Sequence, residues 1–220
     1  STRVPGSGLD EPPPPPPPTG KPKKQTESEK KVSDINNRFR ENGVLALMPN
    51  NPRRAEEIEK SFNNLKSKGY DIPPPEQIFT LDLQKAYGGD YSGTYAVATR
   101  SNTGQEQMIF NSNRFNRKDD KVVFDLENNV RDKWLSTTDV FAHEYGHNSH
   151  IKSIGQERAY AYKETKLTGK DAETASKVSG YAKTNPLEFV AEVFSGHVNG
   201  KKYDKDVYDL YESYKGPKLK

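Results

Sequence analysis

The stretch from Ser136 to Asn148, STTDVFAHEYGHN, places two histidines four residues apart in a segment with a helical pattern. Residues four apart on an α-helix lie one above the other, so the side chains of His143 and His147 project from the same face. Two imidazoles in this arrangement can bind one metal ion. Ser136 and Asp139 have the spacing of a capping box, which predicts that the helix begins beside them.

Glu144 completes the pattern His-Glu-x-x-His, which is typical of zinc-dependent peptidases. Its carboxylate follows the first histidine, where it can accept a proton without being a metal ligand. Two of the four histidines of the chain belong to this motif. The alternative is an ordinary exposed helix with two histidines, because so short a pattern also occurs in unrelated proteins.

The composition limits the kinds of site and partner. The 220 residues contain no cysteine, so a zinc site has to use histidine and carboxylate ligands. The 34 basic and 31 acidic residues are interspersed, and a net charge of +3 predicts neither a nucleic-acid nor a membrane partner. No run of about 18 apolar residues is present, and the first ten residues lack the apolar core of a signal peptide.

Residues 1–30 have a composition that cannot build a core, with seven consecutive prolines from Pro12 to Pro18 followed by charged and small polar residues. We expect a disordered linker whose proline run forms an extended spacer. The alternatives are a ligand for a proline-binding module and a protease substrate. Because the chain starts at Ser1 without a methionine, we expect a processed product or a piece of a larger polypeptide. If it is not part of a larger polypeptide, we expect a monomer.

Residues 31–220 are predicted to form one α+β domain, in which a small mixed sheet packs on the His-Glu-x-x-His helix and a mainly helical part follows. Residues 31–75 are expected to be a helical N-terminal extension. The predicted helices in it are Lys31–Glu41 and Arg53–Lys68, and Ile72 to Pro75 should form an extended connection. The predicted strands are Gln77–Leu81, Thr94–Thr99, Gln107–Asn111 and Lys121–Phe124, with a hairpin from Tyr95 to Phe110.

Further helices are predicted after the motif. They are Glu157–Tyr162, Ala172–Lys183, Asn185–Val198 and Tyr203–Tyr214, the last with an apolar face that we assign to packing. His150, one turn beyond His147, can line a cleft, although such a histidine more often caps a helix or faces water. His197 is expected to favour the C-terminal end of its helix electrostatically rather than to bind metal.

The third metal ligand is expected from a later helix. A catalytic zinc site needs three protein ligands, and the stretch after His147 lacks the glycine and histidine of the longer HExxHxxGxxH motif. The segment from Asn185 fits, because Asn185 can cap a helix, Pro186 suits its first position, and Glu188 and Glu192 share one face. Carboxylates on an apolar helix are costly unless paired or bound to metal. We therefore expect one to be a ligand and the other to hold a ligand histidine, the alternative being that both face solvent.

The pairing of HEYGH with the later stretch SGYAKTNPLEFVAEVF resembles the catalytic domain of anthrax lethal factor and its relatives. This branch of the zincin metallopeptidases includes clostridial Pro-Pro endopeptidases and domains attached to phage head proteins and secreted toxins. The resemblance covers about Thr94 to Val198. It implies a zincin-like fold, Zn²⁺ bound by His143, His147 and Glu188, Glu144 as the general base, and Glu192 as the carboxylate behind a ligand. In that family a tyrosine seven residues before the ligand glutamate assists at the scissile carbonyl, and Tyr181 occupies that position here.

The resemblance implies a zinc endopeptidase that hydrolyses a protein or peptide substrate. In that family an edge strand lies antiparallel to the bound peptide, and Gln107–Asn111 is the candidate for that strand. The resemblance also implies a toxin or phage-associated protease that is secreted or associated with a virion. The alternative function is a non-catalytic structural or tethering domain of a virion or toxin assembly that keeps the same fold.

Overall fold

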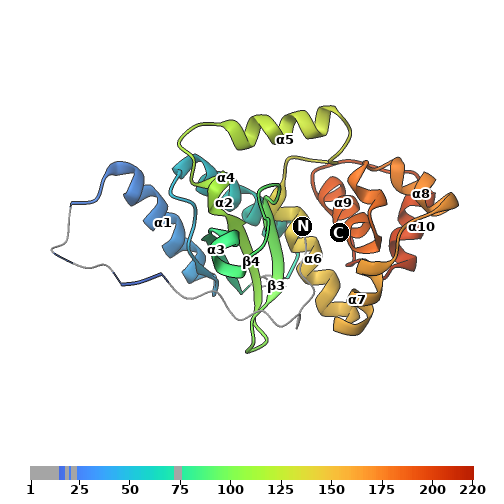
Figure 1. Ribbon diagram of the computed structural model, residues 1–220, viewed down its shortest axis with the longest axis horizontal. Helices are drawn as coiled ribbons and strands as arrows, with labels where there is room; N and C mark the ends of the chain where they lie inside the picture. The colour runs from blue at the N-terminus through green and yellow to red at the C-terminus, as the bar shows by residue number, and fades with distance from the viewer. Residues whose placement is uncertain (1–14, 18–19, 21–23, 72–75) are drawn as a thin grey trace.

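The computed structural model describes residues 15–17, 20, 24–71 and 76–220 (Figure 1). The predicted connection from Ile72 to Pro75 and most of the predicted proline-rich linker lie outside the described residues. The part of the linker next to the domain is helical, because α1 (Glu27–Glu41) begins before Lys31. Thr26 and Glu29 form a capping box at its start, in which each side chain binds the other residue's backbone N–H.

The second helix, α2 (Pro52–Ser67), begins as the sequence predicts. Asn51 caps it by accepting a hydrogen bond from the Arg53 N–H, and Pro52 occupies its first turn. Apolar residues of α1 and α2 belong to the same core as residues of the strands and of the C-terminal helices. The rings of Phe39 and Phe62, one from each helix, are in edge-to-face contact, with their centroids 4.7 Å apart.

A four-stranded mixed sheet lies at the centre of the molecule (Figure 1). Its strands are β1 (Leu45–Ala46), β2 (Gln77–Leu81), β3 (Ala96–Arg100) and β4 (Glu106–Asn111), in the order β1-β2-β4-β3. β1, β2 and β4 pair in parallel, whereas β3 and β4 form the predicted antiparallel hairpin. The prediction that Gln107–Asn111 is an edge strand is wrong. β4 lies between β2 and β3, and all its residues are buried, as is typical of an interior strand.

The predicted strand Lys121–Phe124 is also wrong, because these residues begin the helix α5 (Lys121–Arg131). Val122 and Leu126, one turn apart, are the buried residues of α5, so the apolar pattern has the period of a helix rather than a strand. Two short helices that the sequence analysis does not predict, α3 (Leu83–Tyr87) and α4 (Ser112–Phe115), follow β2 and β4.

The remaining helices follow α5; α6 lies beside the sheet, and α7 to α10 form the group on the right of Figure 1. They are α6 (Val140–Ile154), α7 (Gln156–Glu164), α8 (Gly169–Ser176), a 3₁₀ turn η1 (Tyr181–Lys183), α9 (Pro186–Val198) and α10 (Lys205–Ser213). The helix predicted over Ala172–Lys183 ends early, at Ser176. The chain then turns so that the N–H of Gly180 can donate to the carbonyl of Lys133 before the 3₁₀ turn begins.

α6 and α9 pack together and carry the candidate site. Gly146 permits their close approach, because a Cβ at this position would lie only 3.2 Å from the Phe194 ring. The face of α10 that we assign to packing contributes Val207 and Tyr211 to the core. Within the described ranges, no helix is both long and apolar enough to cross a membrane.

Candidate metal centre

α6 carries His143, Glu144 and His147, and its start is fixed by several side chains. Asp139, not Ser136, is the cap, because the Asp139 carboxylate accepts hydrogen bonds from the Ala142 N–H at 3.0 Å and from the Ser61 hydroxyl at 2.6 Å. Ser136 lies outside the helix, so the predicted capping box does not form. The alternative of an ordinary exposed helix is wrong, because most residues of α6 are buried.

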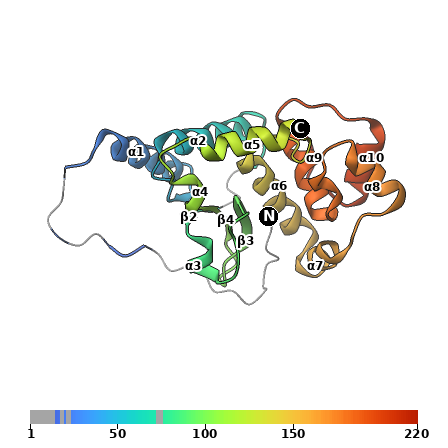
Figure 2. The same ribbon diagram turned by 45° about the horizontal axis from the view of Figure 1, so that its top comes forward.

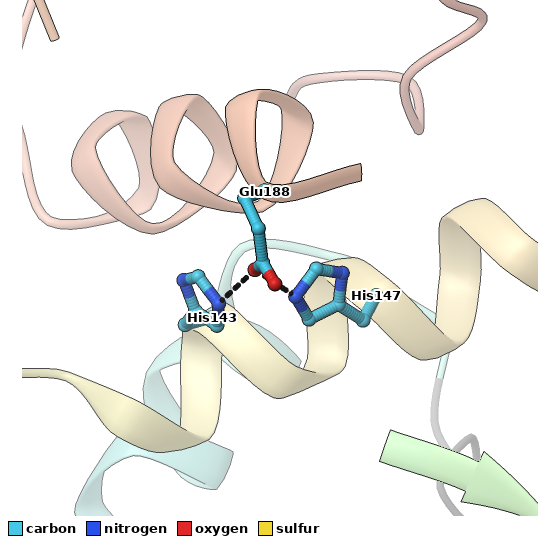
Figure 3. Close-up of side chains that lie close together, drawn as sticks. All are labelled: His143, His147 and Glu188. Atoms are coloured by element: carbon cyan, nitrogen blue, oxygen red, sulfur yellow. Dashed lines mark hydrogen bonds and ion pairs between the residues drawn. The ribbon is translucent and has the colours of Figure 1, made fainter. Parts of the chain in front are cut away.

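His143, His147 and Glu188 converge, as Figure 3 shows. Glu188 extends from α9 toward the two histidines of α6, and its Oε1 lies 3.0 Å from His143 Nε2 and 2.6 Å from His147 Nε2. α9 begins as predicted, because Asn185 caps it by accepting from the Glu188 N–H at 2.9 Å. The alternative that Glu188 and Glu192 face solvent is wrong, since only 5% and 2% of their surfaces are exposed.

Glu192 lies behind His143 and holds it in place. One carboxylate oxygen of Glu192 is 2.9 Å from His143 Nδ1, on the side of the ring away from Glu188. The other accepts hydrogen bonds from the Ser136 N–H at 2.9 Å and the Ser179 hydroxyl at 2.7 Å. The carboxylate therefore fixes the orientation of the His143 ring and directs Nε2 toward Glu188 and His147.

The charges of the cluster stabilise one another. Burial alone would lower the pKa of His143, but its hydrogen bonds to Glu188 and Glu192 outweigh burial and raise the pKa to about 10. Burial alone would raise the pKa of Glu188, yet the neighbouring His147 and His143 hold it well below its usual range. Glu188 is therefore an ionised carboxylate at neutral pH, which is the form that binds a metal ion.

Tyr181 joins the cluster from the 3₁₀ turn. Its hydroxyl donates to Glu188 Oε2 at 2.9 Å, and its ring stacks on His143 at a centroid distance of 5.9 Å. Burial raises the pKa of Tyr181, and the charges of Glu188 and then Glu144 raise it further, so the hydroxyl keeps its proton. Glu144 is buried, and its effect on Tyr181 places its carboxylate within electrostatic reach of the same centre.

The other two histidines lie apart from this cluster. His150 neither lines a cleft nor faces water; it is fully buried, with Nε2 2.8 Å from the carbonyl oxygen of Tyr214. His197 lies in the last turn of α9 as expected, with Nδ1 2.9 Å from the Tyr208 hydroxyl. Burial lowers the pKa of His197, which works against the positive charge that the predicted electrostatic role requires.

Two residues near the cluster, Ser179 and Trp134, are not singled out by the sequence, and Ser136 has another role than the predicted cap. Ser136 and Ser179 bind Glu192, and Trp134 packs against Tyr181 with ring centroids 5.8 Å apart. The serines carry no signal in a single sequence, because any serine can bind a carboxylate. Trp134 had one available signal, since it is the only tryptophan of the chain and lies shortly before the motif.

The residues present fit a zinc ion. Two imidazole nitrogens and one carboxylate oxygen lie within 4.8 Å of one another, all three residues are buried, and the donor set His₂Glu is one that binds catalytic zinc. In such sites the second ring nitrogen of a ligand histidine often binds a carboxylate, and Glu192 is the carboxylate beside His143. Comparisons of the chain with models of protein families, with curated proteins and with solved structures give no match.

Proposed function

We propose that this protein is a zinc-dependent endopeptidase with a zincin-like fold, and that it hydrolyses peptide bonds of a protein substrate. The observation that carries the proposal is the convergence of His143, His147 and Glu188 from two packed helices, with Glu144 beside them. The mixed sheet and the two helices are consistent with the fold that the resemblance implies. Tyr181, seven residues before Glu188, lies at the cluster, where the same resemblance places an assisting tyrosine.

His143, His147 and Glu188 would hold the zinc ion, and Glu192 would keep His143 oriented toward it. A zinc ion held there supplies a Lewis acid that polarises the substrate carbonyl and makes water a better nucleophile near neutral pH. Three protein ligands, rather than four, would be typical of a catalytic and not of a structural zinc site. The set of ligands therefore favours catalysis over a purely structural role.

The two remaining residues of the cluster handle protons and charge. Glu144 accepts a proton from the attacking water and then delivers it to the nitrogen of the leaving amine. The hydroxyl of Tyr181 keeps its proton and so can donate a hydrogen bond to the carbonyl oxygen as negative charge develops on it. Tyr181 then exchanges its hydrogen bond to Glu188 for one to the substrate.

The test is to incubate the zinc-loaded protein with a diverse peptide library and to identify the cleaved bonds by mass spectrometry. The wild type should cleave peptides, and a chelator should stop it. Glu144→Gln should keep zinc and the folded state but lose activity by about a thousandfold or more, because the proton acceptor is gone. Full activity in Glu144→Gln would contradict the mechanism.

The same library separates the peptidase from a tethering domain that uses zinc only to hold its fold. Such a domain should bind zinc equally well in the wild type and in Glu144→Gln, and neither should cleave any peptide. A buried glutamate and a protonated tyrosine beside the ligands favour the peptidase, because a structural site requires neither.

A further inference from the structure

Trp134 lies at the border between the candidate site and the surface. Its indole packs against the ring of Tyr181 at 5.8 Å, and Tyr181 in turn stacks on His143 at 5.9 Å. The three rings therefore form a row that leads from a metal ligand to an indole with 49% of its surface exposed. A large exposed aromatic ring beside a reactive centre is available to contact a ligand.

The backbone holds Trp134 in this position. α5 ends with a Schellman motif, in which the Lys133 N–H donates to Val130 and the Trp134 N–H donates to Asn129. The position that usually carries glycine is Lys133, with a φ of 59°. This left-handed turn ends the helix immediately before the indole.

The same turn is tied to the segment that carries Tyr181. The carbonyls of Lys133 and Trp134 accept hydrogen bonds from the N–H groups of Gly180 and Tyr181, at 2.8 and 3.0 Å. A Cβ at Gly180 would lie 2.6 Å from the indole, so any larger residue there would displace the ring. The indole and the phenol are thus positioned as one unit.

We infer that Trp134 forms the wall of a substrate subsite that accepts a bulky apolar side chain, aromatic side chains best of all. This inference rests on the proposed peptidase function. Successive residues of an extended peptide are about 3.3 Å apart. If the scissile carbonyl lies at Tyr181, the indole, one ring further on, is within reach of a side chain one or two residues from the cleaved bond. The contact would remove the exposed face of the indole and the substrate side chain from water together.

The experiment compares wild type, Trp134→Ala and Trp134→Phe on a tryptophan-free peptide library, with zinc content and circular dichroism as checks of folding. The wild type should prefer a bulky apolar residue at one position within two residues of the cut. Trp134→Ala should lower the ratio of kcat/KM for such peptides to kcat/KM for matched peptides with glycine there by about 10-fold to 100-fold, because only the bulky side chain uses the indole. Trp134→Phe should retain part of the preference. An unchanged preference in Trp134→Ala would overturn the inference.

A second measurement does not depend on cleavage. Because Trp134 is the only tryptophan of the chain, its fluorescence reports directly on this surface. Adding the same tryptophan-free peptides to Glu144→Gln should shift the emission with bulky apolar peptides but not with their glycine counterparts. If the wild type cleaves nothing, the proposed function fails; a fluorescence shift then still supports a peptide subsite at Trp134. An absence of any shift overturns the subsite.

Discussion

Two successive helices of this protein, α5 and α6, are held in opposite ways. α6 packs against α9, the β3–β4 hairpin, α2 and α7, and most of its residues are buried. α5 buries only Val122 and Leu126, and it exposes Phe124. In Figure 2, α5 lies along the top of the molecule beside α2, whereas α6 runs through its middle. Two of the three candidate metal ligands, His143 and His147, thus lie on a helix that is packed on several sides, whereas Trp134 follows a helix with few buried residues.

The difference suggests a division of tasks. A metal site needs side chains fixed to within a fraction of an ångström, which a helix buried on several sides provides. A surface that contacts substrate has to stay exposed before binding, which a peripheral helix and its C-terminal turn allow. Damage to α6 or α9 should therefore affect folding and metal binding together, whereas changes on the exposed face of α5 should leave folding intact.

The largest expected effect is a loss of stability, which a comparison of two phenylalanines tests. Phe194 of α9 is fully buried and contacts the rings of Tyr145 and Tyr70 at 5.6 and 5.2 Å. Phe194→Ala should lower the free energy of unfolding by about 3–5 kcal/mol, because it leaves a cavity between α6 and α9. Phe124→Ala is the matched control on α5, where 62% of the surface of the residue is exposed, and should change stability by less than about 0.5 kcal/mol. Urea unfolding measures both, and equal losses in the two variants would contradict the comparison.

A smaller effect, on the pH dependence of stability, is expected from His150, which also lies on α6. Burial is the main cause that lowers its pKa from 6.5 to about 4, and the nearby His147 acts in the same direction. Between these values the unfolded chain binds a proton that the folded chain does not. The contribution of His150 should therefore make the protein less stable as pH falls from about 6.5 to 4, by about 1.4 kcal/mol per pH unit, and this loss should be absent above about pH 7.

His150→Gln tests this contribution, because glutamine can still donate to the Tyr214 carbonyl but does not titrate. The free energy of unfolding of the zinc-free variant should depend less steeply on pH than that of the zinc-free wild type. Carboxylates that titrate in the same range contribute to both proteins and cancel in the difference. Identical slopes in the two proteins would show that His150 titrates normally and is not held neutral by the fold.

Much of the fold follows from local patterns. Helix starts at Asn51-Pro52 and Asn185-Pro186, and the hairpin of β3 and β4, depend on residues close in sequence, and the structure has all of them. The position of β4 inside the sheet depends instead on its pairing with β2, which no local pattern encodes. The run Val122 to Phe124 is apolar enough for either a strand or a helix, and only its packing decides.

In the candidate site, too, some features follow from local spacing and others from packing. The spacing of His143 and His147, and of Glu188 and Glu192, is a property of single helices and could be predicted. Which glutamate contacts both histidines depends on how α6 and α9 cross, so helical geometry alone left that choice open and only the family resemblance pointed to Glu188. The structure places Glu188 between the histidines and Glu192 behind one of them. The contacts of Trp134 depend on the turn after α5, and the sequence predicts a strand rather than a helix for Lys121–Phe124, where α5 begins.

The most direct test of the central claim is the zinc content of three purified proteins, measured by elemental analysis. The wild type should bind about one zinc per chain, and Glu188→Ala should bind almost none, because it removes one of three ligands. Glu192→Ala should still bind zinc, with an affinity about 10-fold to 100-fold lower, since it removes only the support of His143. A wild type that binds no zinc, or a Glu188→Ala variant that keeps zinc while Glu192→Ala loses it, would contradict the account.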